Sequence, residues 1–180
     1  DDKYLSNVQD PSQDTNNQYF GQPDMVRTST GRLITSYPMG HGKGPLIMKI
    51  SDNDGETWVE KKNTPESWKG SQETPTLYVL NLEDGTERIM LITACPGWGT
   101  DSAGNQYGWN TSYSDDNGET WTEYKHWHSE VAPKDANECI VAMASLIQLK
   151  DEDGNYIQKW MGVFHNYGYQ NYKTYLTFDE

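Results

Sequence analysis

Two octapeptides 63 residues apart decide the fold of this chain: SDNDGETW at 51–58 and SDDNGETW at 114–121. Six of their eight positions are identical. The short polar side chains favour a tight turn held by hydrogen bonds to nearby backbone N–H groups, and the glycine tolerates a positive φ. A tryptophan then places a large apolar ring at the start of the next strand. A repeat of this period indicates that one supersecondary unit occurs more than once.

The segments around the octapeptides alternate short apolar runs with turn residues, a pattern typical of antiparallel strands. In the first unit this pattern predicts strands at 23–28, 32–37, 46–50 and 57–61. In the second unit it predicts strands at 74–80, 88–94, 109–113 and 120–125. A third unit supplies strands at 140–149, 158–164 and 172–178. Four antiparallel strands joined by tight turns make one propeller blade, so we expect an all-β chain of stacked blades.

The octapeptides resemble the Asp box, S-x-D-x-G-x-T-W, of sialidases and their propeller relatives. The box aspartate is Asp116 in the second copy and Asn53 in the first, where the amide oxygen can accept the same local bonds. The segment YFGQPDMVRT at 19–28, followed by GRLI at 31–34, is similar to the opening of the sialidase family. A calcium loop is disfavoured, because the glutamate that closes an EF-hand loop does not follow and no flanking helices are predicted.

The resemblance implies a six-bladed β-propeller of four-stranded antiparallel blades, with about half of the ring in this chain. We expect a polar N-terminal segment at 1–19 and a partial propeller at 20–180. Its blades are expected at about 20–70, 71–134 and 135–180, the last cut inside a turn. An open ring exposes strand edges, so a longer chain, a separate C-terminal half or a second copy could complete it.

The resemblance also implies site residues, and the sequence departs from the family pattern at two of them. The first arginine of the family's carboxylate clamp corresponds to Gly21. The loop that carries the family's general acid corresponds to 39–44, MGHGKG, which holds no carboxylate. The family's nucleophilic tyrosine and its glutamate partner are expected beyond residue 180. A neutral substrate needs no arginine clamp, so these departures leave the substrate open.

In a propeller, the starts of the inner strands and the loops between second and third strands surround the central pocket, away from the box turns. Glycoside hydrolysis usually needs two carboxyl groups, and Asp24 with Glu73 or Glu138 is a candidate pair. A histidine in a glycine-rich loop can transfer protons, and a neighbouring lysine can meet an anionic group. We predict catalytic roles for Asp24, Glu73 and His41, and substrate contacts from Gln22, Lys43, Trp98, Asp101, Glu138, His165 and Tyr167. Strand-capping carboxylates and ordinary surface loops remain the alternative for these positions.

We therefore expect a sialidase-like glycoside hydrolase that removes terminal sugars from glycans, nominally sialic acid. A non-catalytic propeller that binds carbohydrate or protein, and a propeller glycosidase for a neutral sugar of the exo-arabinanase kind, are the alternatives. No cofactor is expected. His126 and His128 lie two apart on one strand face, but we interpret them as a surface pair rather than a metal site.

The bulk composition narrows the partners. Aromatic residues make up 12% of the chain, including 7 Trp and 12 Tyr, which suits a sugar-facing surface. The net charge of −13 and a pI near 4.6 make nucleic acid a poor partner. No apolar run reaches the roughly 18 residues that span a bilayer. We expect a secreted or periplasmic protein, with the cytoplasm left open, and Cys95 and Cys139 either form one disulfide or stay as free thiols.

Overall fold

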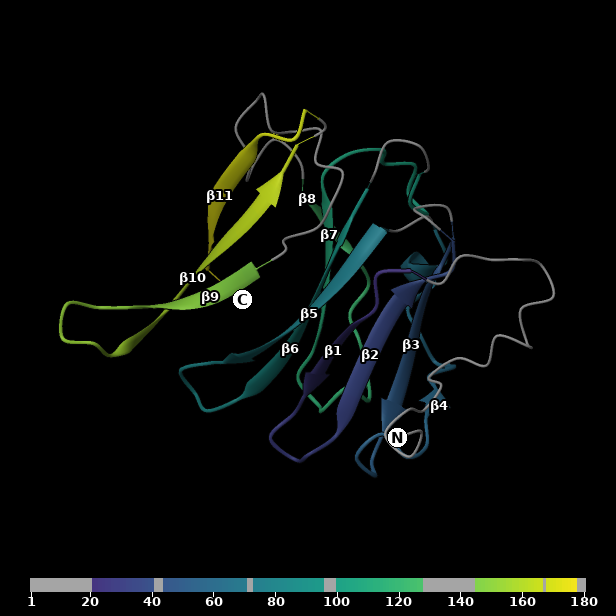
Figure 1. The fold of residues 1–180 in the computed structure, drawn as a ribbon, viewed down its shortest axis with the longest axis horizontal. Coiled ribbons are helices and arrows are strands. Elements are labelled where there is room, and N and C mark those ends of the chain that lie inside the picture. The colour runs from purple at the N-terminus through teal and green to yellow at the C-terminus, as the bar shows by residue number, and fades with distance from the viewer. Residues whose placement is uncertain are drawn as a thin grey trace, which may run out of the picture.

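Three antiparallel sheets follow one another along the chain in the computed structural model, which describes residues 21–40, 44–70, 73–95, 100–127, 145–166 and 168–177 (Figure 1). The first sheet has the order β1 (Asp24–Arg27), β2 (Leu33–Pro38), β3 (Leu46–Ser51) and β4 (Val59–Glu60). The second has the order β5 (Glu73–Asn81), β6 (Glu87–Ala94), β7 (Trp109–Ser114) and β8 (Lys125–Trp127). The third contains β9 (Ser145–Lys150), β10 (Tyr156–His165) and β11 (Asn171–Leu176), in the order β11-β10-β9. The prediction of an all-β chain built from four-stranded antiparallel sheets is confirmed.

The main difference from the predicted strands lies in the outer strand of the second sheet. We predicted this strand at 120–125, but regular pairing with β7 begins only at Lys125. The reason is that a side-chain oxygen replaces a backbone acceptor between the two strands. Tyr113 N donates to Thr122 Oγ1 at 3.1 Å, while Thr122 N donates to Tyr113 O. The threonine hydroxyl thus takes the place of a backbone carbonyl and delays the strand.

A short 3-10 helix, η3 (Glu66–Lys69), was not predicted from the sequence. It buries Trp68, which is 1% exposed, between the first and second sheets. The carboxylate of Glu123 accepts the backbone N–H groups of Glu66 and Ser67 and so anchors the helix start to the second sheet. Within the described residues, no helix is long and apolar enough to cross a bilayer.

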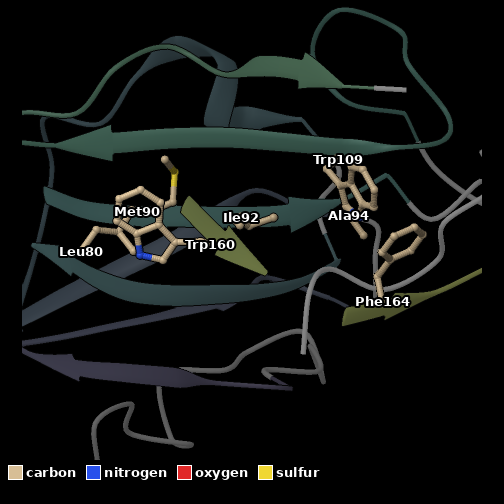
Figure 2. Packing of buried hydrophobic residues seen from close by; sticks show 7 residues of the cluster. All are labelled: Leu80, Met90, Ile92, Ala94, Trp109, Trp160 and Phe164. Atoms are coloured by element: carbon tan, nitrogen blue, oxygen red, sulfur yellow. The ribbon is translucent and has the colours of Figure 1, made fainter. Parts of the chain in front are cut away.

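The second sheet is buried on both of its faces. On β6, Ile89 and Leu91 belong to a core shared with the first sheet, whereas Met90 and Ile92 belong to a core shared with the third. Successive strand residues point to opposite faces, so this alternation stacks three sheets face to face. Figure 2 shows the second core, which also contains Leu80, Ala94, Trp109, Trp160 and Phe164.

The two repeated octapeptides form the same hydrogen-bonded turn. In the first, Ser51 Oγ accepts Gly55 N at 2.9 Å and Asn53 Oδ1 accepts Thr57 N at 3.0 Å. In the second, Ser114 Oγ accepts Gly118 N at 2.8 Å and Asp116 Oδ1 accepts Thr120 N at 2.8 Å. The expectation that Asn53 replaces the aspartate as an acceptor without loss of the turn is confirmed.

In the first two sheets, an arginine at the start of the second strand binds the octapeptide turn after the third strand. Arg88 makes two hydrogen bonds to Asp115, of 2.7 and 2.8 Å. Arg32 pairs with Asp52 of the first octapeptide and also reaches Glu119 and the carbonyl of Asn117 in the second. The hydrogen bonds that Arg32 donates to Asp52 and Glu119 raise the pKa of Arg32 above its ordinary range, so it stays charged and ties the two turns together.

Substitution of the two turn glycines separates backbone strain from packing. Gly55 and Gly118 have φ of 86° and 82°, which costs an alanine about 1–2 kcal/mol. A Cβ at Gly55 meets only ordinary contacts at 3.7 Å, whereas one at Gly118 lies 2.6 Å from the buried Ile34 side chain. We expect Gly118→Ala to lower the free energy of unfolding by about 1–3 kcal/mol more than Gly55→Ala in urea titrations. Equal losses would show that Ile34 yields without cost.

The two turns are also expected to differ in their acid sensitivity. Burial opposes ionisation of Asp116, but hydrogen bonds from Thr120 and Ser114 outweigh it and lower its pKa below the ordinary 3.8. A lowered folded-state pKa contributes stability above the unfolded value, and this contribution is lost as the pH falls through 3.8 and below. Asp116→Asn should therefore flatten the acid limb of the stability curve, and Asn53→Asp should steepen it. An effect of Asp116→Asn on the free energy of unfolding that does not change with pH would contradict this prediction.

Candidate functional site

The five predicted site residues within the described part of the chain all lie at the same end of the strands in the three sheets. In each sheet, the start of the first strand pairs with the end of the second: Asp24 with Ser36, Glu73 with Ala94, and Ser145 with Val163. The octapeptide turns lie at the opposite end of the strands, since Ser51 pairs with Leu33 at the start of β2. The predicted separation between the turns and the candidate site is therefore present in the strand register.

The backbone is strained at the same place in the first two sheets. Gln22 precedes Pro23 with φ of 55°, and Thr74 precedes Pro75 with φ of 43°. A positive φ is unfavourable for a β-branched residue, and such strain gathers at functional sites where the surrounding structure enforces it. The Thr74 hydroxyl donates to Gln22 Oε1 at 2.8 Å and so links the two strained positions across the sheets.

An open groove of about 430 Å³ follows this link between the first and second sheets. Its lining consists of Gln22, Pro23, Asp24, Thr74, Pro75, Thr76, Leu77 and Tyr78. Another cavity, of about 160 Å³, lies by β3, β4 and η3 and holds Lys61, Lys62 and Lys69, but it does not contain the predicted site residues. We therefore take the groove at the inner strands as the candidate site.

Asp24 lines the groove and joins the two sheets. Its Oδ1 accepts Met25 N at 2.8 Å, and its Oδ2 accepts Leu77 N, from β5, at 2.7 Å. Both backbone N–H groups complement the negative charge of the carboxylate. Asp24 therefore has a strand-joining role in addition to the catalytic role predicted for it, which stays a prediction.

Glu73 lies behind the groove rather than in its wall. Its side chain is 1% exposed, and Oε1 is 3.3 Å from the Thr74 hydroxyl that also reaches Gln22. A carboxyl group is rarely buried to this degree without a specific role. Glu73 and Asp24 thus occupy contrasting environments, one enclosed and one on the groove surface.

Tyr78 was not predicted for the site, although it lines the groove. Burial raises its pKa to about 12, a hydrogen bond with Thr76 opposes this shift, and the negative charge of Asp24 adds to it. The phenol therefore stays protonated at physiological pH and can donate a hydrogen bond. Its position four residues after Thr74 in a long apolar strand gave no sequence signal of this role.

Asp101 closes the loop in which it lies. Its Oδ1 accepts the N–H groups of Ala103 and Asn105, and its Oδ2 accepts the amides of Asn105 and Asn110. Burial raises the pKa of Asp101, but these bonds outweigh burial and lower it overall. The side chain is 7% exposed, so the structure shows a loop-forming role, and its predicted contact with substrate stays a prediction.

His165 ends β10 at the same edge of the third sheet. Its Nδ1 lies 2.9 Å from the carbonyl of Asn166, and its ring centroid is 5.5 Å from that of Tyr169. The hairpin thus presents a histidine beside an exposed tyrosine, and the predicted contact of His165 with substrate stays a prediction. The remaining predicted site residues lie outside the described part of the chain: His41, Lys43, Trp98, Glu138 and Tyr167.

His126 differs from its interpretation as half of a surface pair. It is half-buried, and its Nδ1 lies 2.9 Å from Asn110 Oδ1 and 3.9 Å from Cys95 Sγ. Cys95 is buried and forms no disulfide with any residue in the described part of the chain. His128 and Cys139 lie outside the described residues, so the proposed pairing of the histidines is untested.

Comparisons with known proteins place the fold. No protein-family model matches the chain, and no curated protein matches it. Among solved structures it is similar to one described as Hadza microbial sialidase Hz136, with TM-score 0.53 and 16% identity over 87% of this chain and 34% of that one. It is also similar to the α-L-arabinofuranosidase arb93a from Fusarium graminearum, with TM-score 0.52 and 16% identity over 82% of this chain and 42% of that one. The chain therefore spans less than half of either neighbour and shares the all-β fold of propeller glycosidases.

Thr74 offers a direct test of the link across the groove. Thr74→Ser keeps the hydroxyl and removes the branch that disfavours a positive φ, so we expect stability equal to or above that of the natural chain. Thr74→Ala also removes the bond to Gln22, which should lower the free energy of unfolding by about 1 kcal/mol relative to Thr74→Ser. Indistinguishable urea midpoints for Ser and Ala would contradict a stabilising link.

Proposed function

We propose that this chain forms part of an exo-acting glycoside hydrolase that removes terminal sugars from glycans. The observation that carries the proposal is that two carboxylates of neighbouring sheets, Asp24 and Glu73, lie at the same end of the strands, each within two residues of a strained residue. The link from Thr74 to Gln22 connects them beside an open groove. The similarity in fold to a sialidase and an arabinofuranosidase supports this class of reaction without choosing a substrate.

The proposed chemistry uses the two environments differently. Glu73, enclosed behind the groove, is assigned as the acid; its proton passes to the Thr74 hydroxyl, which lines the groove and gives its own proton to the glycosidic oxygen as the bond to the anomeric carbon breaks. Asp24, on the groove surface, is assigned as the carboxylate that takes a proton from the water that attacks that carbon. Tyr78 stays protonated and is assigned as a donor to a sugar hydroxyl. The octapeptide turns are proposed to be structural Asp boxes.

Two substrate classes follow from different observations. The octapeptides and the opening segment favour sialic acid, the nominal substrate. The groove favours a neutral sugar, because the residues that line it in the described part of the chain include an aspartate and no arginine or lysine. A carboxylate-bearing sugar next to Asp24 would lack the cationic fork that usually binds it.

The test is hydrolysis by the full-length protein of two fluorogenic glycosides, an α-sialoside and an α-L-arabinofuranoside. We expect turnover of at least one, and Glu73→Gln should lower kcat by about 10²–10⁴-fold with little change in KM. Glu83→Gln, in the exposed turn after β5, is the matched control and should retain full activity. Far-ultraviolet circular dichroism checks that both variants fold.

The two arms separate the alternatives. Turnover of the arabinofuranoside alone would select the neutral-sugar enzyme, and turnover of the sialoside alone would select the sialidase. Full activity in Glu73→Gln would remove Glu73 from the mechanism. Absence of turnover of both substrates together with binding of a glycan would replace the enzyme by the non-catalytic binding propeller.

A further inference from the structure

A compact group of metal-ligating side chains lies in the second sheet, apart from the groove. It consists of Cys95, just after β6, Asp101, in the loop that follows, and His126, in β8. Their ligand atoms all lie within 4.8 Å of one another. Cys95 Sγ is 3.9 Å from Asp101 Oδ2 and 3.9 Å from His126 Nδ1. The three atoms thus surround a common point from three different segments.

Strand pairing explains why these distant residues meet. Cys95 and Asn110 each follow a residue of the core in Figure 2, Ala94 and Trp109, so strand alternation turns them to the opposite face of the sheet. Asn110 pairs directly with His126 in the ladder between β7 and β8. Its side-chain amide donates to Asp101 Oδ2 at 2.9 Å, and its Oδ1 lies 2.9 Å from His126 Nδ1. The amide therefore holds the donor atoms in place.

We propose that Cys95, Asp101 and His126 bind a divalent transition-metal ion of the zinc type. One sulfur, one imidazole nitrogen and one carboxylate oxygen form a donor set that Zn²⁺ accepts in tetrahedral sites. Three protein donors leave a fourth position, which the nearby Asn110 Oδ1 or a solvent molecule can fill. Cys95 and Asp101 are buried while His126 is half-exposed, so the ion enters from the side of β8.

Proton balance makes the binding pH-dependent. Asn110 Nδ2 donates to Asp101, so Asn110 Oδ1 is the acceptor for His126 and the imidazole proton lies on Nδ1. On binding, that proton moves to Nε2, the Cys95 thiol releases its proton to solvent, and the carboxylate of Asp101 is already ionised. One proton is therefore released for each ion bound.

The alternative is a hydrogen-bonded network that only fixes the loop at 100–108 to β7 and β8. Asp101 alone is accounted for in this way, because its oxygens accept four bonds from its own loop and from Asn110. The network holds Asp101 without any contribution from Cys95 or His126, whereas a metal site uses the donor atoms of all three residues. A bound ion would also join β6 and the loop to the three-residue strand β8, which pairs with β7.

The experiment is a titration of the reduced full chain with Co²⁺, which reports thiolate ligation through a sulfur-to-cobalt absorption band. We expect one Co²⁺ per chain and displacement by Zn²⁺. The band should be absent in Cys95→Ser and in His126→Gln. The matched controls Cys139→Ser and His128→Gln change the same residue types and should keep it.

A second readout does not depend on the spectrum. Zn²⁺ should raise the melting temperature of the natural chain and of both controls, but not that of Cys95→Ser, because only a folded site binds the ion. Absence of a thiolate band in the natural chain at excess Co²⁺ would overturn the proposal without reference to any variant. Persistence of the band in Cys95→Ser, or its loss in Cys139→Ser instead, would also overturn it.

Discussion

Burial of the second sheet on both faces is the constraint on which the rest of the structure depends. Ile89 and Leu91 pack toward the first sheet, and Met90 and Ile92 pack toward the third. Burial of each such side chain contributes about 1.5–3 kcal/mol. A strand that is apolar on both faces, however, gains almost as much after a shift of one residue, so hydrophobicity alone does not fix its register. Another interaction must therefore fix the register.

The octapeptide turns fix the register. Each turn binds its own backbone through a serine hydroxyl and an asparagine or aspartate oxygen, so the residue at which the strand ends is set locally. Arg88 then binds Asp115 with two hydrogen bonds, and Arg32 extends the same contact to the turn of the next sheet. Because the turns fix the strand register at one end, the opposite end of the strands can hold the strained backbone at Gln22 and Thr74. The octapeptide turns and the candidate site thus lie at opposite ends of the same strands.

The elements that could be predicted from the sequence are those defined by local chemistry. The turns, most strands and their order follow from glycines, short polar side chains and apolar runs, and the common edge of the candidate site follows from that order. Other features depend on contacts that no local pattern contains. Thr122 delays β8 by bonding Tyr113, and Trp68 creates η3 because it fits between two sheets. Asp24 binds Leu77 N, 53 residues away, which only the packed sheets bring within reach.

Asp101 and Asp151 show how the same local motif acquires different roles. Both begin a D-x-x-G-N loop, and in both an Oδ1 accepts the N–H groups two and four residues later, at nearly the same distances. Asp151 lies in an exposed hairpin and does no more than close its turn. Asp101 lies at the edge that carries the candidate site, where the fold adds Asn110 and Cys95 to its other oxygen. The local sequence determines the turn. The contacts that its aspartate makes depend on the end of the sheet at which the turn lies and on the side chains of the neighbouring strands.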